Sequence, residues 1–379
     1  MKLSGKGIII FKAGAMGWKN SRCFCSTLHK IFLRQMRKNI KNFPSAEYRL
    51  LELLKPYLNY RPGGYFETGS GDDAAVRKCG RGERLVCTAD TLIESRHFSF
   101  KYMSIREAGY KAMAVNLSDC AAMGAVPDGA LVQVAFPSGN ADIEKAIVEL
   151  YRGLHAACRR WRFPIVGGNL SGGPCWIIDI TLIGRLSRGS RPLLRAGAKK
   201  GDILWVTGNP GESRAGLELL RKYGRNRLSR LVHTLAIRHI APEPRVAAGR
   251  ALAAQKQVHA AIDISDGVSK ECLTLSCENN LVIELDITER LASSPLKAAA
   301  RLLGKSSWVP WLLHGGEDYE LLFAASPSFD PRPVCRASGV CCRPIGRFVE
   351  KGYGVFMRDT SGNRAPVENA GWDHLRHRK

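Results

Sequence analysis

The strongest constraint on the fold is an alternation of two apolar patterns along most of the chain. Short runs rich in branched and aromatic residues predict strands, and longer segments with apolar residues three or four positions apart predict helices. The first half predicts strands at 84–87, 130–136 and 176–185, with helices at 104–123 and 141–161. After a basic connection at 187–200, a second set begins with a strand at 202–206 and a helix at 213–223. We therefore predict a mixed α+β fold with two lobes, 45–185 and 186–379.

Residues 1–44 differ from the rest in charge, with ten Lys or Arg and no Asp or Glu. Met16 and Met36 are internal methionines, so we expect this basic extension to be either a disordered arm or a stretch ahead of the true start. Helical spacing over 46–58 predicts the first helix of the folded region. No run approaches the roughly 18 consecutive apolar residues of a membrane span, so we expect a soluble protein without membrane association.

The net charge of the chain favours anionic partners but does not show which kind of anion is bound. The net charge of +23 suits nucleic acid, a membrane surface or phosphorylated small molecules. Aromatic residues do not alternate with Lys and Arg, which argues against nucleic acid, although a binding role for residues 1–44 alone stays open. The 12 cysteines are scattered without CxxC spacing or a signal peptide, which favours reduced thiols in the cytoplasm.

Carboxylates are placed unusually in this basic chain. Five aspartates stand at the ends of apolar segments beside Gly, Ser or Thr: Asp73, Asp90, Asp119, Asp263 and Asp266. Oxygen ligands without a Cys/His cluster favour Mg²⁺, which usually binds together with substrate phosphates. The sequence therefore predicts phosphate chemistry supported by several Mg²⁺ ions.

The two commonest ATP-binding designs are excluded. The chain has neither a Walker A sequence nor the Gly-rich loop, HRD and DFG set of protein kinases. The Gly208–Gly211 turn leads into a predicted helix and is interpreted either as a phosphate site at the helix N-terminus or as a simple tight turn.

Longer motifs point to one family. They are GDDAA (71–75), TADTLIESRHF (88–98), GYKAMAVNLSDCAAMGAVP (109–127), VGGN (166–169), RAGAKKGDILWVTGNPGES (195–213), AIDISDG (261–267), HGGEDYELLF (314–323) and GWDHL (371–375). In these segments the chain resembles the thiamine-monophosphate kinase family, within the superfamily of aminoimidazole ribonucleotide synthetase. The resemblance implies that superfamily's two-lobed fold and a homodimer with a shared barrel built from N-terminal strands. It also implies Mg²⁺- and ATP-dependent phosphorylation of thiamine monophosphate to thiamine diphosphate by direct in-line transfer.

The resemblance also implies roles for individual residues. Metal ligands are expected at Asp73, Thr88, Ala89, Asp90, Asp119, Asn169, Asp263 and Asp266. Contacts to ATP are expected from Tyr151, Gly168, Arg195 and Ser265. Contacts to thiamine monophosphate are expected from His97, Glu317 and Trp372. No covalent nucleophile is expected, and the metal-bound Asp119 and Asp263 are expected to be the most critical residues.

Two positions depart from the family pattern. Ala89 stands where the family usually has Thr, and Asn169 where it frequently has Asp. Ala89 could still offer its carbonyl oxygen, and Asn169 its neutral amide oxygen, so we expect a weakened metal site. Asn169 leans toward other ATP-using enzymes of the superfamily, such as selenophosphate synthetase, but the early Cys-containing glycine-rich segment of that enzyme is missing.

Overall fold

The computed structural model describes residues 54, 65–69, 71–137, 142–225, 229–358, 363–368 and 370–372. The chain divides into two compact units, Met1–Phe43 and Pro44–Lys379. The basic extension and, apart from Leu54, the helix expected at 46–58 lie outside the described residues.

The first lobe is built on a six-stranded sheet. Its strands are β1 (Phe66–Thr68), β2 (Ala75–Lys78), β3 (Arg84–Ile93), β4 (Val126–Pro137), β5 (Ile165–Gly173) and β6 (Ile177–Leu186). They lie in the order β1-β2-β3-β6-β4-β5, and only the β4–β5 pair is parallel. A short 3₁₀ turn, Gly80–Gly82, joins β2 to β3.

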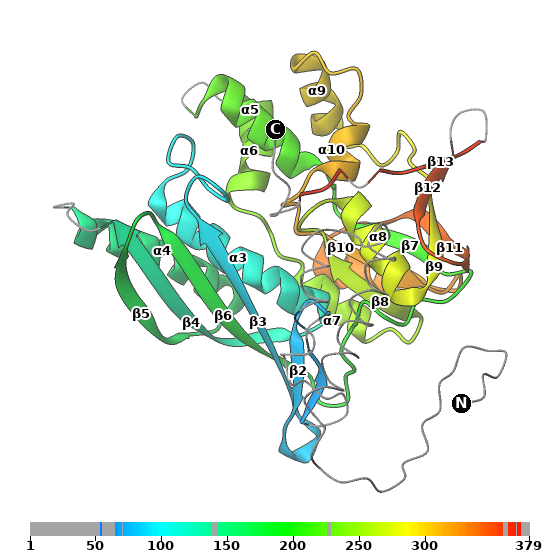
Figure 1. The fold of residues 1–379 in the computed structure, drawn as a ribbon, viewed down its shortest axis with the longest axis horizontal. Coiled ribbons are helices and arrows are strands. Elements are labelled where there is room, and N and C mark those ends of the chain that lie inside the picture. Colours follow the sequence, from blue (N-terminus) through cyan, green and yellow to red (C-terminus); the bar gives the residue numbers. More distant parts are fainter. Residues whose placement is uncertain are drawn as a thin grey trace, which may run out of the picture. The chain divides into compact units, whose positions relative to one another are not determined.

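Two helices cover one face of this sheet, as Figure 1 shows. They are α3 (Ile105–Ala122) and α4 (Ile143–Trp161). Helix α3 starts at a capping box in which Ser104 and Glu107 satisfy each other's backbone N–H groups. Along β6, Ile178, Ile180 and Leu182 are buried beneath the helices, whereas the alternate residues are only half-buried. The opposite face of the sheet is therefore left more open.

The second lobe is built on a seven-stranded sheet with the order β13-β12-β9-β11-β7-β10-β8. Its strands are β7 (Ile203–Thr207), β8 (Val258–Asp263), β9 (Leu281–Leu285), β10 (Leu321–Ala325), β11 (Cys342–Lys351), β12 (Val355–Arg358) and β13 (Arg364–Pro366). The helices are α5 (Glu212–Tyr223), α6 (Arg230–Ile240), α7 (Val246–Ala253), α8 (Val268–Asn279), α9 (Ser294–Leu302), α10 (Val309–His314) and α11 (Arg332–Ser338).

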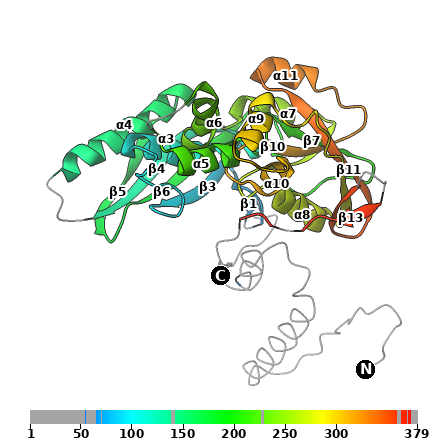
Figure 2. The same ribbon diagram turned by 90° about the horizontal axis from the view of Figure 1, so that it is seen from above.

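Helices lie on both faces of the second sheet, as the turned view in Figure 2 shows for α7 and α11 on one side and α8 on the other. Strand β10 is buried at every residue. Leu321 and Phe323 belong to a core shared with α7, α11 and the first lobe, and Leu322 and Ala324 to one shared with α5, α8, α9 and α10. A strand that is buried on both faces has a continuous apolar sequence, and β10 has the sequence LLFAA.

The structure confirms the predicted α+β class with two sheets. The expected boundary at 185 falls at the end of β6, and each helix and strand predicted between 84 and 223 is present. The predicted strand at 84–87 continues to Ile93 because its pairing with β6 continues to Ile177. Among the described residues, no helix has the length and apolar character needed to cross a bilayer, and all ten described cysteines are free thiols.

Candidate active site

Three aspartates from distant parts of the sequence, two of them buried and Asp119 half-buried, meet where the two lobes join. Asp73 lies in the turn before β2, Asp119 in the last turn of α3, and Asp263 at the end of β8. One carboxylate oxygen from each lies within 4.8 Å of the other two. Helix α3 makes this possible because it packs against β3 in the first lobe and against β8 in the second. These three acids, expected from their positions at the ends of apolar segments, are therefore neighbours.

Hydroxyl groups fix the orientation of two of these carboxylates. Thr88 Oγ1 donates a hydrogen bond to Asp119 Oδ2. Ser118 Oγ donates to Asp263 Oδ2 at 2.6 Å, across the junction of the lobes. Both Ser118 and Asp263 are buried, and a buried polar group is costly unless it is hydrogen-bonded. The protein therefore orients these acids by contacts within its own core.

Burial and mutual repulsion oppose ionisation of the cluster. Burial raises the pKa of Asp119 well above its usual range, and the charges of Asp90, Asp263 and Asp73 raise it further. Burial, followed by repulsion from Asp73, raises the pKa of Asp263 to about 8. A cation bound among these carboxylates would remove both costs.

Asp73 shows that the cluster fits a metal ion. Its Oδ2 is buried and has no hydrogen-bond partner, although buried polar atoms are normally paired. An unpaired carboxylate oxygen beside two further carboxylates is the oxygen-rich ligand set that Mg²⁺ prefers. The residues present therefore fit the Mg²⁺ that the sequence predicted.

Two cations pair with acids of the site. Arg195 Nε donates to Asp73 Oδ1 at 2.9 Å, and the Arg195 backbone N–H donates to Asp72 Oδ1 at 3.2 Å. Lys270 Nζ lies 2.5 Å from Asp266 Oδ2. These positive charges lie beside acids that the sequence assigned to metal binding, so they are also placed to attract phosphate.

A buried lysine joins two residues that were expected to bind thiamine monophosphate. Lys111, in the middle of α3, is completely buried, and its Nζ lies 2.7 Å from Glu317 Oε1 and donates to the carbonyl of His97 at 3.1 Å. Burial alone would raise the pKa of Glu317, but Lys111 lowers it below its usual range. Burial, followed by repulsion from Lys111, lowers the pKa of nearby His239 to about 3. At neutral pH this end of the site therefore presents an ionised Glu317 and a neutral His239.

The backbone around Glu317 has an uncommon conformation. Glu317 and Tyr319 both have positive φ, 64° and 52°, although neither is glycine. Their N–H groups donate to the carbonyls of Ser265 at 2.7 Å and Ile264 at 2.9 Å. The segment that carries Glu317 is thereby pinned to the segment that carries Asp263 and Ser265.

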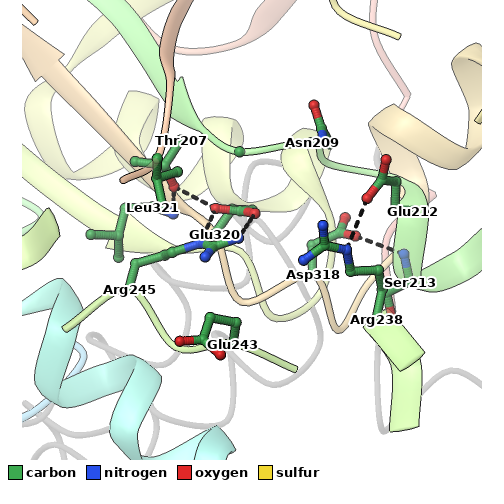
Figure 3. Close-up of polar contacts among 12 residues, drawn as sticks. Thr207, Asn209, Glu212, Ser213, Arg238, Glu243, Arg245, Asp318, Glu320 and Leu321 are labelled. Atoms are coloured by element: carbon green, nitrogen blue, oxygen red, sulfur yellow. Dashed lines mark hydrogen bonds and ion pairs between the residues drawn. The ribbon is translucent and has the colours of Figure 1, made fainter. Parts of the chain in front are cut away.

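Asp318, the residue after Glu317, lies beside Ser213 and Arg238 of the second lobe, as Figure 3 shows. Its carboxylate accepts hydrogen bonds from the N–H groups of Gly211 at 2.7 Å and Ser213 at 3.1 Å. These N–H groups stand at the start of α5, where a phosphate was one of the two interpretations of the Gly208–Gly211 turn. Because a carboxylate of the protein already occupies them, the tight-turn interpretation holds.

Glu320 anchors the same segment two residues further on (Figure 3). Arg245 donates to both carboxylate oxygens at 2.7 and 2.5 Å, and Thr207 Oγ1 donates at 2.7 Å. Gly208 has a φ of +56°, and a Cβ there would come within 1.8 Å of Glu320 Oε1. Paired Arg–carboxylate contacts of this kind fix geometry well, so Asp318 and Glu320 hold Glu317 and Tyr319 toward the site.

One cavity of about 1380 Å³ contains most of the predicted site residues. They are Asp73, Thr88, Ala89, Asp90, His97, Asp119, Arg195, Asp263, Ser265, Asp266, Glu317 and Trp372. The N–H of Trp372 donates to the carbonyl of Asp266 at 3.0 Å, which holds Trp372 at the cavity wall. Twelve of the 15 predicted positions are therefore brought together.

The other three predicted positions do not line this cavity. Gly168 and Asn169 lie on the edge strand β5, which β6 and β4 separate from β3. Tyr151 lies on α4, partly buried against the core of the first lobe. Within a single chain these residues are apart from the aspartate cluster.

Sequence reasoning missed three charged or polar residues of this cavity region. Lys111 is flanked by small and apolar residues in GYKAMAV, and its burial depends on how α3 packs against both lobes. His239 and Lys270 lie on helices whose faces toward the cavity are set by tertiary packing. Asp266 precedes the N-cap of α8 and Lys270 lies in its first turn, so their contact is set by the turn that leads into the helix and not by helical spacing.

Comparisons with known proteins agree on one family. The family described as AIR synthase related protein, N-terminal domain, matches residues 71–186. The thiamine-monophosphate kinase of Bacillus subtilis is 33% identical over 317 residues, which is 82% of this chain and 94% of that protein. The thiamine-monophosphate kinase of Rhodopirellula baltica is 36% identical over 81% of this chain and 90% of its own length.

A solved structure gives the same result. AaThiL complexed with AMPPCP and TMP has a TM-score of 0.75 and 31% identity, and the match covers 87% of this chain and 97% of that one. The likeness therefore extends over both lobes.

Proposed function

Because this chain belongs to the thiamine-monophosphate kinase family, we propose that it transfers the γ-phosphate of ATP to thiamine monophosphate, giving thiamine diphosphate and ADP. The observation that carries the proposal is the cluster of Asp73, Asp119 and Asp263, with a buried, unpaired oxygen on Asp73. It lies in the same cavity as Glu317, an ionised carboxylate suited to a cationic ligand. The relative AaThiL was solved with AMPPCP and TMP, one ligand for each substrate role.

Asp73, Asp119 and Asp263 would hold Mg²⁺, with Asp90, Asp266 and Thr88 beside them. When bound, Mg²⁺ supplies positive charge that offsets the negative charge on both phosphate groups. Arg195 adds a fixed positive charge on the Asp73 side. These groups serve to hold donor and acceptor against their mutual repulsion.

The reaction needs no nucleophilic side chain and no strong general base. The acceptor is a phosphate oxygen of thiamine monophosphate that is already ionised near neutral pH. In an in-line transfer, that oxygen forms a bond to the γ-phosphorus while the bond to the bridging oxygen of ADP breaks, and ADP leaves with the electron pair. This balance agrees with a cavity lined by carboxylates, arginines and lysines.

The thiamine end would lie against Glu317, His97 and Trp372. Lys111 keeps Glu317 ionised, and the carboxylate then attracts the cationic thiazolium ring. An aromatic face such as that of Trp372 binds the same cation through its ring electrons. His97 is fixed in place because its Nδ1 accepts a hydrogen bond from the Ile93 N–H at 2.9 Å.

The direct test is to mix the purified protein with ATP, Mg²⁺ and thiamine monophosphate and to separate the products by chromatography. We expect thiamine diphosphate and ADP in equal amounts, and neither product when EDTA replaces Mg²⁺. ADP without thiamine diphosphate, from protein with an intact fold, would reject this acceptor in favour of another ATP-using reaction of the superfamily.

A homodimer built through the first lobe would explain how Gly168 and Asn169 can belong to an active site although they lie apart from the aspartate cluster of their own chain. Val166 and Leu170 of the edge strand β5 are 59% and 51% exposed, and an apolar sheet edge is normally covered. We propose that the open face and edge of this sheet meet a second copy, so that Gly168 and Asn169 serve the partner's cavity. Light scattering coupled to size exclusion should give twice the chain mass of 41.7 kDa, and a monomer would remove this role.

Replacing Asn169 by Asp should strengthen Mg²⁺ binding if position 169 contributes a metal ligand. A carboxylate attracts Mg²⁺ more strongly than a neutral amide, so we expect the Mg²⁺ concentration for half-maximal rate to fall by about threefold to tenfold. Asn280→Asp, at the C-terminal end of α8, is the matched control and should leave it unchanged. An unchanged or raised value in Asn169→Asp would show that position 169 is not a ligand.

A further inference from the structure

Lys270 stands at an unusual place for a lysine. It lies in the first turn of α8, lines the cavity, and is only 7% exposed. The positive end of the helix dipole is at this terminus, so a cation there is on the unfavourable side. A nearly buried ammonium is also costly unless an anion is close. Its position therefore requires an anionic partner.

Asp266 is the partner in the structure, with its Oδ2 2.5 Å from Lys270 Nζ. The same Asp266 belongs to the set of expected metal ligands, and its N–H donates to Glu271 Oε1 at 3.0 Å. Lys270 is therefore next to the acids that receive Mg²⁺, where the phosphates of the substrates would also lie. If Lys270 served only to neutralise Asp266, it would not need to line the cavity.

Two cations of the protein form ion pairs with acids near the segment that carries Asp263 and Ser265. Arg195 pairs with Asp73, and Lys270 pairs with Asp266. All six residues line the same cavity. This arrangement places two positive charges of the protein beside carboxylates of the site, where they attract anionic groups that enter the cavity.

We propose that Lys270 is a substrate-binding residue whose ammonium contacts a phosphate oxygen at the reacting centre, in addition to pairing with Asp266. The proposal rests on the proposed kinase function for the identity of the phosphates. The shared chemistry is a phosphate oxygen, which belongs either to ATP or to thiamine monophosphate. In both cases Lys270 adds charge that a neutral side chain cannot supply, and an arginine can replace it in part.

Calorimetric binding of AMPPCP and of thiamine monophosphate, each with saturating Mg²⁺, tests the proposal without turnover. We expect Lys270→Met to weaken at least one of the two ligands by about tenfold or more, and Lys270→Arg to weaken it by about threefold or less. Weakening of AMPPCP alone assigns the contact to ATP, and weakening of thiamine monophosphate alone assigns it to the acceptor. Lys222→Met, which removes an exposed lysine of α5 outside the cavity, should bind both ligands like the wild type.

A double variant separates phosphate binding from a purely structural counter-ion. Lys270→Met leaves Asp266 without its cation, so Asp266→Asn is compared with Asp266→Asn/Lys270→Met, in which no charge of this pair is left unpaired. A further loss of at least fivefold in ligand binding in the double variant supports the proposal. Equal binding by these two proteins overturns it, and so does wild-type binding by Lys270→Met. The kinase proposal fails separately, if the wild type forms no thiamine diphosphate.

Discussion

Replacing Asp119 by Asn is expected to abolish thiamine diphosphate formation while the protein stays folded. Asp119 is half-buried beside Asp73 and Asp263, and its Oδ2 accepts a hydrogen bond from the Thr88 hydroxyl. Asn keeps the size and one acceptor oxygen but removes the negative charge that would hold Mg²⁺. We expect kcat to fall by about a thousandfold or more, because the stabilisation of the transferring phosphoryl group depends on that cation. Chromatographic product formation measures the loss, and circular dichroism checks the fold.

The matched control is Asp128→Asn, which neutralises an exposed aspartate on β4 that forms a surface ion pair with Arg185 at 3.2 Å. Surface pairs contribute about 0–1 kcal/mol, so rate and stability should remain close to those of the wild type. If Asp119→Asn retained a rate within tenfold of the wild type, the aspartate cluster would not be the centre of the reaction.

The effect of Asp119→Asn can also be measured without turnover, through the pH dependence of stability. Because burial and Asp73 raise the pKa of Asp263 from 3.8 to about 8, the native protein without metal binds more protons than the unfolded chain between these values. The contribution of Asp263 to stability therefore falls as pH rises from about 4 to about 8. Asp119→Asn removes one of the repelling carboxylates, so the fall in Tm over this pH range should be shallower. A steeper fall in the variant would contradict the repulsion that we infer.

Sequence patterns predicted the local parts of this fold well. Helix α3 was expected at 104–123 and spans Ile105–Ala122. The agreement is close because its N-terminal cap is formed by Ser104 and Glu107, which are only three positions apart in sequence. Strand β5 was missed, because Gly167, Gly168, Gly172 and Gly173 have little strand propensity and the pairing with β4 decides its conformation. Local propensity and long-range pairing disagree there.

The sequence predicted which residues belong to the site better than it predicted which of them contact one another. The placement of aspartates at the ends of apolar segments indicated Asp73, and the family resemblance, now confirmed by relatives, supplied Arg195 and Glu317. No local pattern shows that Arg195 pairs with Asp73, which is 122 residues away. The same limit applies to Lys111, whose partners His97 and Glu317 lie on either side of it in sequence. Such pairs depend on how α3 packs between the two lobes.

Replacing Lys111 by Met should destabilise the fold and weaken thiamine monophosphate binding together. Lys111 is completely buried, and its loss leaves Glu317, whose side chain is 26% exposed, without its cation. Breaking a buried ion pair from one side costs about 3–5 kcal/mol, and we expect the lower end because Glu317 keeps some contact with solvent. Guanidinium unfolding measures the loss, and calorimetry with thiamine monophosphate measures the binding.

The double variant Lys111→Met/Glu317→Gln separates the effect of the Lys111 charge on stability from the effect of its packing. It leaves no unpaired carboxylate, so at least half of the lost stability should return, whereas binding should stay weak because the cationic ring has lost Glu317. Arg106→Met on the same helix removes an exposed ion pair with Glu149 and should change the free energy of unfolding by less than about 1 kcal/mol. If the single and double variants were equally unstable, packing around Lys111, not its charge, would determine the effect. Recovery of stability without recovery of binding would show that one buried lysine both stabilises the junction of the lobes and keeps Glu317 ionised for its ligand.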